Sequence, residues 1–154
     1  MVKTARWLKS WLPVILWMAL IFTGSTDRGS AGHTSGFIEP LLHWLMPGLS
    51  HESIDSLHHL IRKCAHITEY AVLGALALRA IAPSHAGSLA EKRWKIAGLA
   101  LAMAALYAAS DEFHQSFVPS RGASVQDVLI DTCGACVGIG VLLLWRKRHD
   151  KRES

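Results

Sequence analysis

Four segments of the chain are apolar over lengths that suit a membrane span, and they cover about residues 7–24, 60–82, 95–114 and 124–145. A helix of about 20 mostly apolar residues crosses the hydrocarbon core of a bilayer. The chain has 154 residues, which is enough for one domain. We therefore predict a single membrane domain over residues 1–154, an all-α integral membrane protein built as a bundle of about four transmembrane helices.

The polar residues of the last three spans lie at alternating ends. The second span begins with polar residues, the third ends with them and the fourth begins with them. Because consecutive spans run antiparallel, we expect these three polar ends at one face of the membrane. The lysines and arginines that flank the spans fall at the other face: Lys3, Arg6, Lys9, Lys92, Arg93, Lys95, Arg146, Lys147, Arg148, Lys151 and Arg152. The positive-inside rule then predicts that both termini are cytoplasmic and that the polar ends face outward.

The remaining segments are an outer connection, residues 25–59, and a basic cytoplasmic tail, residues 146–154. The connection contains FIEPLLHWLMPGL, which is too short to span and favours an interfacial or re-entrant helix. The net charge of +4 is concentrated beside the spans, so we expect no nucleic-acid partner. Cys133 and Cys136 lie among small residues of the fourth span, and close packing is a simpler interpretation than a redox or metal pair.

Ionisable residues inside the spans share helix faces, as a rotation of 100° per residue shows. One face of the second span carries Arg62, Lys63, His66, Glu69 and Tyr70. One side of the third span carries Tyr107, Asp111, His114 and Gln115, with Glu112 turned somewhat away. A stripe of the fourth span carries Ser124, Asp127, Asp131, Gly134 and Gly138, and its G-x-x-x-G part predicts close packing against the bundle.

This cluster has a structural and a functional interpretation. In the structural one, Arg62 and Lys63 neutralise the carboxylates, and the histidines form hydrogen bonds between helices. In the functional one, the cluster is a pocket with acid–base groups beside cations, because ionisable residues within a membrane usually mark a site. The donors would also suit a metal, but their spacing lacks the H-E-x-x-H pattern of zinc peptidases, so metal and cofactor stay open.

Three blocks of the chain closely resemble the VanZ-like family: RKCAHITEYAVLGALAL at residues 62–78, YAASDEFHQSFVPSRGAS at 107–124 and QDVLIDTCGACVG at 126–138. The resemblance implies a multi-spanning bacterial membrane protein of the cytoplasmic (inner) membrane, and the family's named member is associated with low-level teicoplanin resistance. It implies no established reaction. Ser120 departs from the glycine expected before Arg121, which changes the turn there because glycine adopts conformations that serine resists.

The leading hypothesis is a cell-envelope protein that recognises or modifies an anionic lipid or lipid-linked headgroup at the outer leaflet. The candidate acid–base groups, orienting groups or metal ligands are His66, Glu69, Asp111, Glu112, His114, Asp127 and Asp131. The candidate substrate-binding residues are Arg62, Lys63, Tyr70, Gln115 and Arg121. Membrane lipids, a lipid-linked cell-wall precursor and a second copy of the chain are the candidate partners.

Two alternatives remain open. A lipid transporter or flippase would use the paired charges as a relay, and with so few spans it would need an oligomer. A membrane interaction protein would use the charged cluster only as structure. It would tolerate a conservative change such as Asp131→Asn.

Overall fold

The computed structural model describes residues 2–26, 31–82, 89–119 and 122–153, and the described residues form helices without strands. The elements are α1 (Val2–Gly24), α2 (Ala31–Leu45), α3 (His51–Ile81), α4 (Leu89–Gln115) and α5 (Val125–Glu153). All of these except α2 are long and apolar enough to cross a membrane. The prediction of an all-helical chain with four membrane-capable helices is therefore confirmed.

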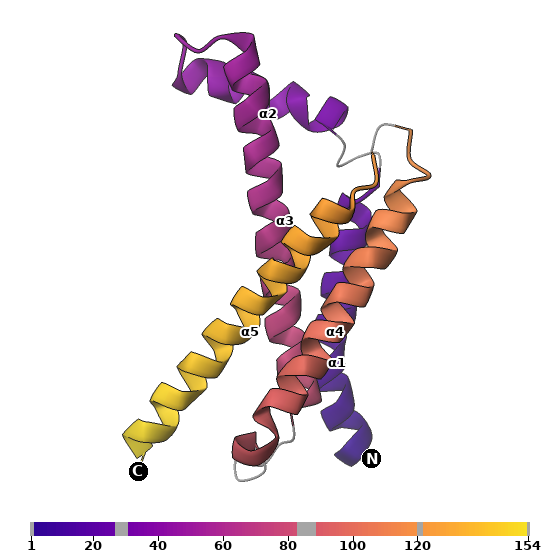
Figure 1. Ribbon diagram of the computed structural model, residues 1–154, viewed down its shortest axis with the longest axis vertical. Coiled ribbons are helices and arrows are strands. Elements are labelled where there is room, and N and C mark those ends of the chain that lie inside the picture. Colours follow the sequence, from indigo (N-terminus) through magenta and orange to yellow (C-terminus); the bar gives the residue numbers. More distant parts are fainter. Residues whose placement is uncertain (1, 27–30, 83–88, 120–121, 154) are drawn as a thin grey trace.

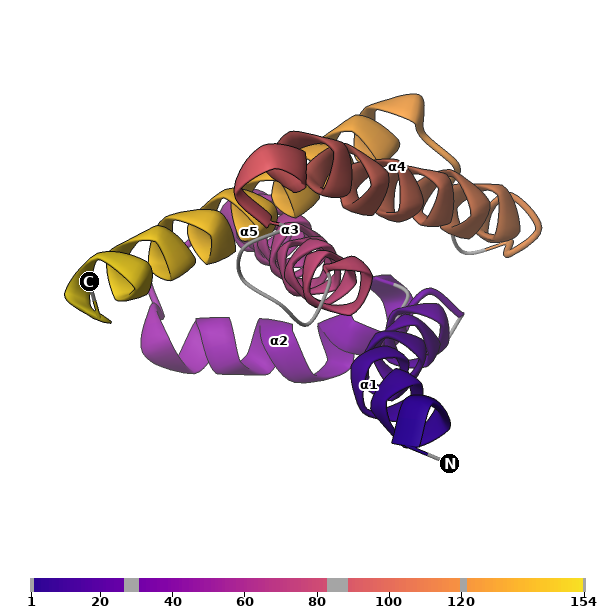
Figure 2. The same cartoon turned by 90° about the horizontal axis from the view of Figure 1, so that it is seen from below.

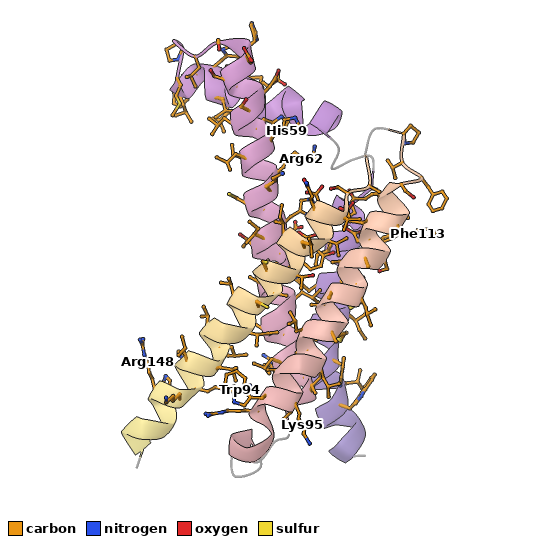
Figure 3. All side chains as sticks on the ribbon, viewed as in Figure 1. His59, Arg62, Trp94, Lys95, Phe113 and Arg148 are labelled. Atoms are coloured by element: carbon orange, nitrogen blue, oxygen red, sulfur yellow. The ribbon has the colours of Figure 1, made fainter. Side chains whose placement is uncertain are left out.

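The four long helices run alternately up and down around α3 (Figure 1). Seen along the bundle, α3 lies at the centre, with α4 and α5 on one side and α1 and α2 on the other (Figure 2). The first turns of α1 and the last turns of α5 lie at the same end of the bundle (Figure 1). Trp94, Lys95 and Arg148 also lie toward this end (Figure 3), which matches the predicted grouping of basic residues. Which side of the membrane this end faces stays a prediction.

The segment expected as an outer connection contains more helix than the hydropathy pattern predicts. It holds α2 and the first turns of α3, which begins at His51 instead of residue 60. Ser50 caps α3, because its side-chain oxygen accepts a hydrogen bond from the Ser53 amide at 3.3 Å. Leu42 of α2 and Ile54 of α3 are buried where α2 packs against α3. This contact stabilises a polar stretch of helix that hydropathy alone assigns to a loop.

Small residues let α3 and α5 cross with their backbones in contact. A Cβ atom added at Gly134 would lie 2.5 Å from the carbonyl oxygen of Ile67, and one at Gly74 would lie 2.6 Å from that of Ala135. A Cβ atom at Gly138 would overlap the carbonyl of Ala71. The glycine stripe of α5 therefore faces α3, as predicted, in the close packing typical of membrane helices.

The cysteines of α5 differ from the prediction. Cys133 and Cys136 are free and exposed, so they do not pack between helices. The reason is the orientation of α5: its glycine stripe occupies the side that contacts α3, and the cysteines fall on the outer surface.

The end of the bundle below this crossing has an apolar interior. Alanines and leucines fill the space between α3, α4 and α5, and among them Leu73, Ala77, Ala100 and Ala104 are fully buried. The outer surfaces of the same helices carry exposed large apolar side chains, such as Leu99 and Leu144. Lipid-facing surfaces of membrane helices have this composition. The packed core therefore holds the helices together below their polar ends.

Candidate functional site

A cavity of about 280 Å³ lies at the polar end, between α3 and the α4–α5 pair. Its lining residues are His59, Arg62, Lys63, His66, Glu112, Gln115, Gly122, Asp127, Ile130 and Asp131. The polar ends of the second, third and fourth spans therefore meet, as the antiparallel order predicts. The α3–α5 crossing begins directly beside it, because Gly134 contacts Ile67 one position after His66.

The α3 wall of the cavity carries the basic side chains. His59, Arg62 and His66 follow one another at helical spacings of three and four residues, and Lys63 lies four residues after His59 and three before His66, which places all four on one face. Figure 3 shows His59 and Arg62 close together on the upper part of α3. This wall presents two permanent positive charges and two imidazoles to the cavity.

The opposite wall carries carboxylates from α4 and α5. Glu112 and Asp131 are only 6% and 2% exposed, and Asp127 is partly buried. The Ser124 amide donates a hydrogen bond to Glu112 Oε2 at 2.8 Å, which joins the end of α4 to the start of α5. Asp131 lies within electrostatic range of Glu112, Asp111 and Asp127. The α4–α5 wall is therefore acidic where the α3 wall is basic.

His66 and Glu69 form a pair within α3. Nδ1 of His66 lies 3.8 Å from Oε2 of Glu69, one helical turn away. The Trp17 indole donates a hydrogen bond to the Glu69 carbonyl oxygen at 2.8 Å, which holds α1 against α3 at this level. Glu69 does not line the cavity, but His66 does. A carboxylate therefore lies within ion-pair range of an imidazole that the cavity can reach.

Tyr107, Asp111 and His114 of α4 face α1 instead of the cavity, and Gln115, which lines the cavity, is bonded to Asp111. Ser25 Oγ donates to Asp111 Oδ2 at 2.6 Å, and Gln115 Nε2 donates to the same oxygen at 3.0 Å. The Tyr107 hydroxyl donates to the Met18 carbonyl oxygen at 2.6 Å. The rings of His114 and Phe22 lie 4.6 Å apart. These contacts attach α4 to the end of α1.

The division of α4 into two sides corrects the helical-wheel prediction. Glu112 was predicted as a site residue turned somewhat away from the side of Asp111 and His114; it lines the cavity, whereas Asp111 and His114 contact α1. Helical periodicity gives the directions of the side chains around α4 relative to one another, but it does not give which helix lies in each direction. The position of α1 decides that, and no residue pattern marks it.

Tyr70 lies beneath the cavity, in the interior of the bundle. Its side chain is fully buried, and its ring centre is 6.3 Å from that of Tyr107. Within the described part of the chain, neither its hydroxyl nor Oδ1 of Asp111 has a hydrogen-bond partner. Tyr70 does not line the cavity. Its predicted contact with a substrate is therefore not supported by its place in the fold.

Seven of the predicted site residues line the cavity: Arg62, Lys63, His66, Glu112, Gln115, Asp127 and Asp131. Four others do not: Glu69, Tyr70, Asp111 and His114. Arg121 lies outside the described residues. The sequence prediction missed His59, Gly122 and Ile130; of these, His59 had a usable signal, because it continues the spacing of Arg62 and His66 by one turn.

The carboxylates and histidines do not gather as metal ligands in the ranges that the structure describes. No group of three or more His, Cys, Asp or Glu side chains there is arranged to hold a metal ion. The described geometry instead pairs a basic wall with an acidic one. Such a site can bind an anion on one side and accept hydrogen bonds on the other.

Comparison with known proteins gives one match. A model of the VanZ/LLP1 family matches residues 10–146, a range that includes every residue lining the cavity. No curated protein and no solved structure matches the chain. Together with the four apolar helices, the match indicates a multi-pass membrane protein.

Proposed function

The chain belongs to the VanZ/LLP1 family, and we propose that it binds the anionic headgroup of a membrane lipid or lipid-linked precursor in this cavity and performs acid–base chemistry on it. The observation that carries the proposal is a cavity with a basic wall on α3 and an acidic wall on α4 and α5, at one end of a membrane bundle.

Arg62 and Lys63 are the anion-binding residues. Both line the cavity, and neither forms an ion pair with a described carboxylate. A cation that is not paired with a carboxylate of the described residues is available for a phosphate, and such charge-assisted hydrogen bonds are about twice as strong as neutral ones. The two side chains therefore fix the headgroup against α3.

His66 is the acid–base residue, and Glu69 orients it. A carboxylate beside one ring nitrogen sets the tautomer of an imidazole and stabilises its protonated form, as in many general bases. The 3.8 Å separation is compatible with this role, since catalytic hydrogen bonds tighten in the complex with substrate. Asp131 faces the basic wall from α5 and positions the group that reacts.

The site is assigned to the outer leaflet of the bacterial cytoplasmic membrane. Lys95 and Arg148 lie at the end of the bundle opposite the cavity (Figure 3), Arg79 lies in the last turn of α3, and the positive-inside rule predicts that this end is cytoplasmic. A change of headgroup there would connect the cavity to the teicoplanin resistance with which the family's named member is associated.

The packing below the cavity favours this function over transport. A relay for ions or lipids needs polar groups along the whole span. Below the α3–α5 crossing, the described interior consists of apolar side chains such as Leu73, Ala77 and Ala100, which are fully buried. A headgroup site open at one end needs no such path.

The test is complementation of glycopeptide susceptibility and of envelope lipid composition in cells. His66→Ala, Glu69→Gln and Asp131→Asn are compared with wild type at matched membrane levels. Asp55→Asn is the control, because Asp55 is an exposed carboxylate of α3 outside the cavity. Removal of a general base lowers a rate by about 10²–10⁴-fold, so we expect loss of the effect in His66→Ala. Full activity in all three variants would overturn the catalytic assignment.

A second pair of variants tests the anion site separately. We expect Arg62→Ala and Lys63→Gln to weaken headgroup binding, whereas Lys95→Gln, at the far end of the bundle, leaves it unchanged. An interaction protein without chemistry would retain its effect in Asp131→Asn and lose it only when binding is lost.

A further inference from the structure

We infer that the cavity selects a zwitterionic headgroup, one that carries a phosphate and, a few bonds away, a primary ammonium group. The inference rests on the proposed function and names the class of lipid that the same site takes. It concerns recognition, and it involves no covalent step.

Four charged residues that line the cavity stand on opposite walls, and the described residues form no ion pair between them. Arg62 and Lys63 lie on α3, and Asp127 and Asp131 lie on α5, yet no ion pair joins these residues in the structure as described. Separated charges of this kind are costly in a membrane protein unless a ligand or water compensates them. A purely anionic ligand satisfies only the α3 wall. A ligand with charges of both signs satisfies both walls.

Asp131 is the residue placed to accept a hydrogen bond from the ligand. Its side chain lines the cavity, yet the residue is only 2% exposed. None of the described residues donates a hydrogen bond to its carboxylate, and Glu112, Asp111 and Asp127 add negative potential around it. Buried carboxylates are normally hydrogen-bonded or paired. A primary ammonium supplies three N–H donors and a positive charge, whereas a quaternary ammonium supplies the charge without the donors.

The size of the cavity fits a small headgroup. Its volume of about 280 Å³ lies at the lower edge of the range of roughly 300–1,000 Å³ that is usual for sites of drug-sized ligands. This space suits a phosphate, a two-carbon linker and an amine. It does not enclose a glycan with an attached peptide. Exposed apolar residues beside the lining, Leu60 on α3 and Leu129 on α5, offer contacts for acyl chains outside the cavity.

The experiment measures binding of four short-chain phospholipids to the purified full chain by native mass spectrometry in detergent. The dihexanoyl forms of phosphatidylethanolamine, phosphatidylcholine, phosphatidylglycerol and phosphatidic acid have the same acyl chains and differ only in headgroup. We expect the ethanolamine lipid to bind at least about tenfold more tightly than the other three, which corresponds to about 1.4 kcal/mol.

Two variants test which wall of the cavity binds the ammonium group and which binds the phosphate. Asp131→Asn should reduce the ethanolamine preference to less than about threefold while phosphatidic acid still binds, because the amide loses the charge that attracts the ammonium. Arg62→Ala should weaken the binding of all four lipids. Asp127→Asn, at the start of α5, repeats the test if Asp131→Asn fails to fold. Asp55→Asn and Lys95→Gln are the matched controls outside the cavity.

The outcomes separate the inference from the proposed function. If phosphatidic acid binds as tightly as the ethanolamine lipid and Arg62→Ala weakens both, the anion site stands and the zwitterion inference is overturned. If neither Arg62→Ala nor Asp131→Asn changes the binding of any lipid, both are overturned. An ethanolamine preference that disappears only in the α5 variants supports both.

Discussion

The two halves of α3 meet the rest of the bundle in different ways. The lower half contributes Tyr70, Leu73, Gly74, Ala77 and Leu78 to the interior, all of them buried, and its backbone contacts that of α5. In the upper half, buried residues are few, and the helix carries long charged side chains toward a cavity. Small residues let helices approach and close the space between them. Long polar residues hold the same two helices apart and leave room for a ligand.

Breaking the contact in the lower half should have the largest effect. Gly138→Ala places a methyl group into the carbonyl of Ala71, and since both atoms belong to helix backbones neither can move alone. We expect a loss of about 3 kcal/mol in the free energy of unfolding, at the upper end of the range for overpacked cores. Titration with SDS in mixed micelles measures it.

Gly140→Ala is the control for this change, because nothing lies within 4 Å of a Cβ atom at Gly140. We expect a gain of up to about 1 kcal/mol there, from the higher helix propensity of alanine. Equal stability of the two variants would mean that α3 and α5 do not pack through this stripe.

The next effect concerns the link between α1 and the polar end of α4. Ser25→Ala removes the hydroxyl that donates to buried Asp111 at 2.6 Å and leaves the carboxylate with fewer donors. An unsatisfied buried polar group costs about 1–3 kcal/mol, and we expect about 2 kcal/mol in the same SDS titration. Thr23→Ala, whose hydroxyl bonds to a carbonyl at an exposed position, should change stability by less than about 0.5 kcal/mol. Similar losses in both variants would contradict the assignment.

The loss of a tyrosine hydroxyl should have a smaller effect on stability, and the effect should differ between Tyr107 and Tyr70. Tyr107→Phe removes a hydrogen bond to the Met18 carbonyl oxygen and should cost about 1 kcal/mol. Tyr70→Phe should cost close to nothing, because its hydroxyl has no hydrogen-bond partner among the residues described. Thermal unfolding followed by tryptophan fluorescence can rank the two variants. A more damaging Tyr70→Phe would reveal a partner for this hydroxyl.

The smallest effect is expected at the start of the upper half. Ser50→Ala removes the cap of α3, a change that costs about 0.5–1 kcal/mol, and the site is exposed. Amide hydrogen exchange should become faster in the first turn after His51 and stay unchanged around Leu73. Ser56→Ala, which removes a hydroxyl bonded within the helix, is the control. A change that spread to Leu73 would show that the two halves of α3 are not independent.

The parts of the fold that depend on local pattern were predictable. Hydropathy over about 20 residues located the four spans, and helical periodicity placed Gly134, Gly138 and Asp131 on one side of α5. The upper turns of α3 were not predicted, because their polar residues lower the mean hydropathy and the helix depends on contact with α2. The exposed side of α5 was also missed, so Cys133 and Cys136 were expected inside the bundle.

The sequence by itself determined which residues could meet. The alternation of polar ends brought Arg62 and Lys63 to the same end of the bundle as Asp127 and Asp131, because antiparallel spans of similar length leave no other arrangement. Only the tertiary structure decided which of them share a cavity. Asp111 and His114 contact the end of α1 and do not line the cavity. The close contact between α3 and α5 marks the inner end of the cavity. Both depend on contacts between segments far apart in the chain, which no local pattern records.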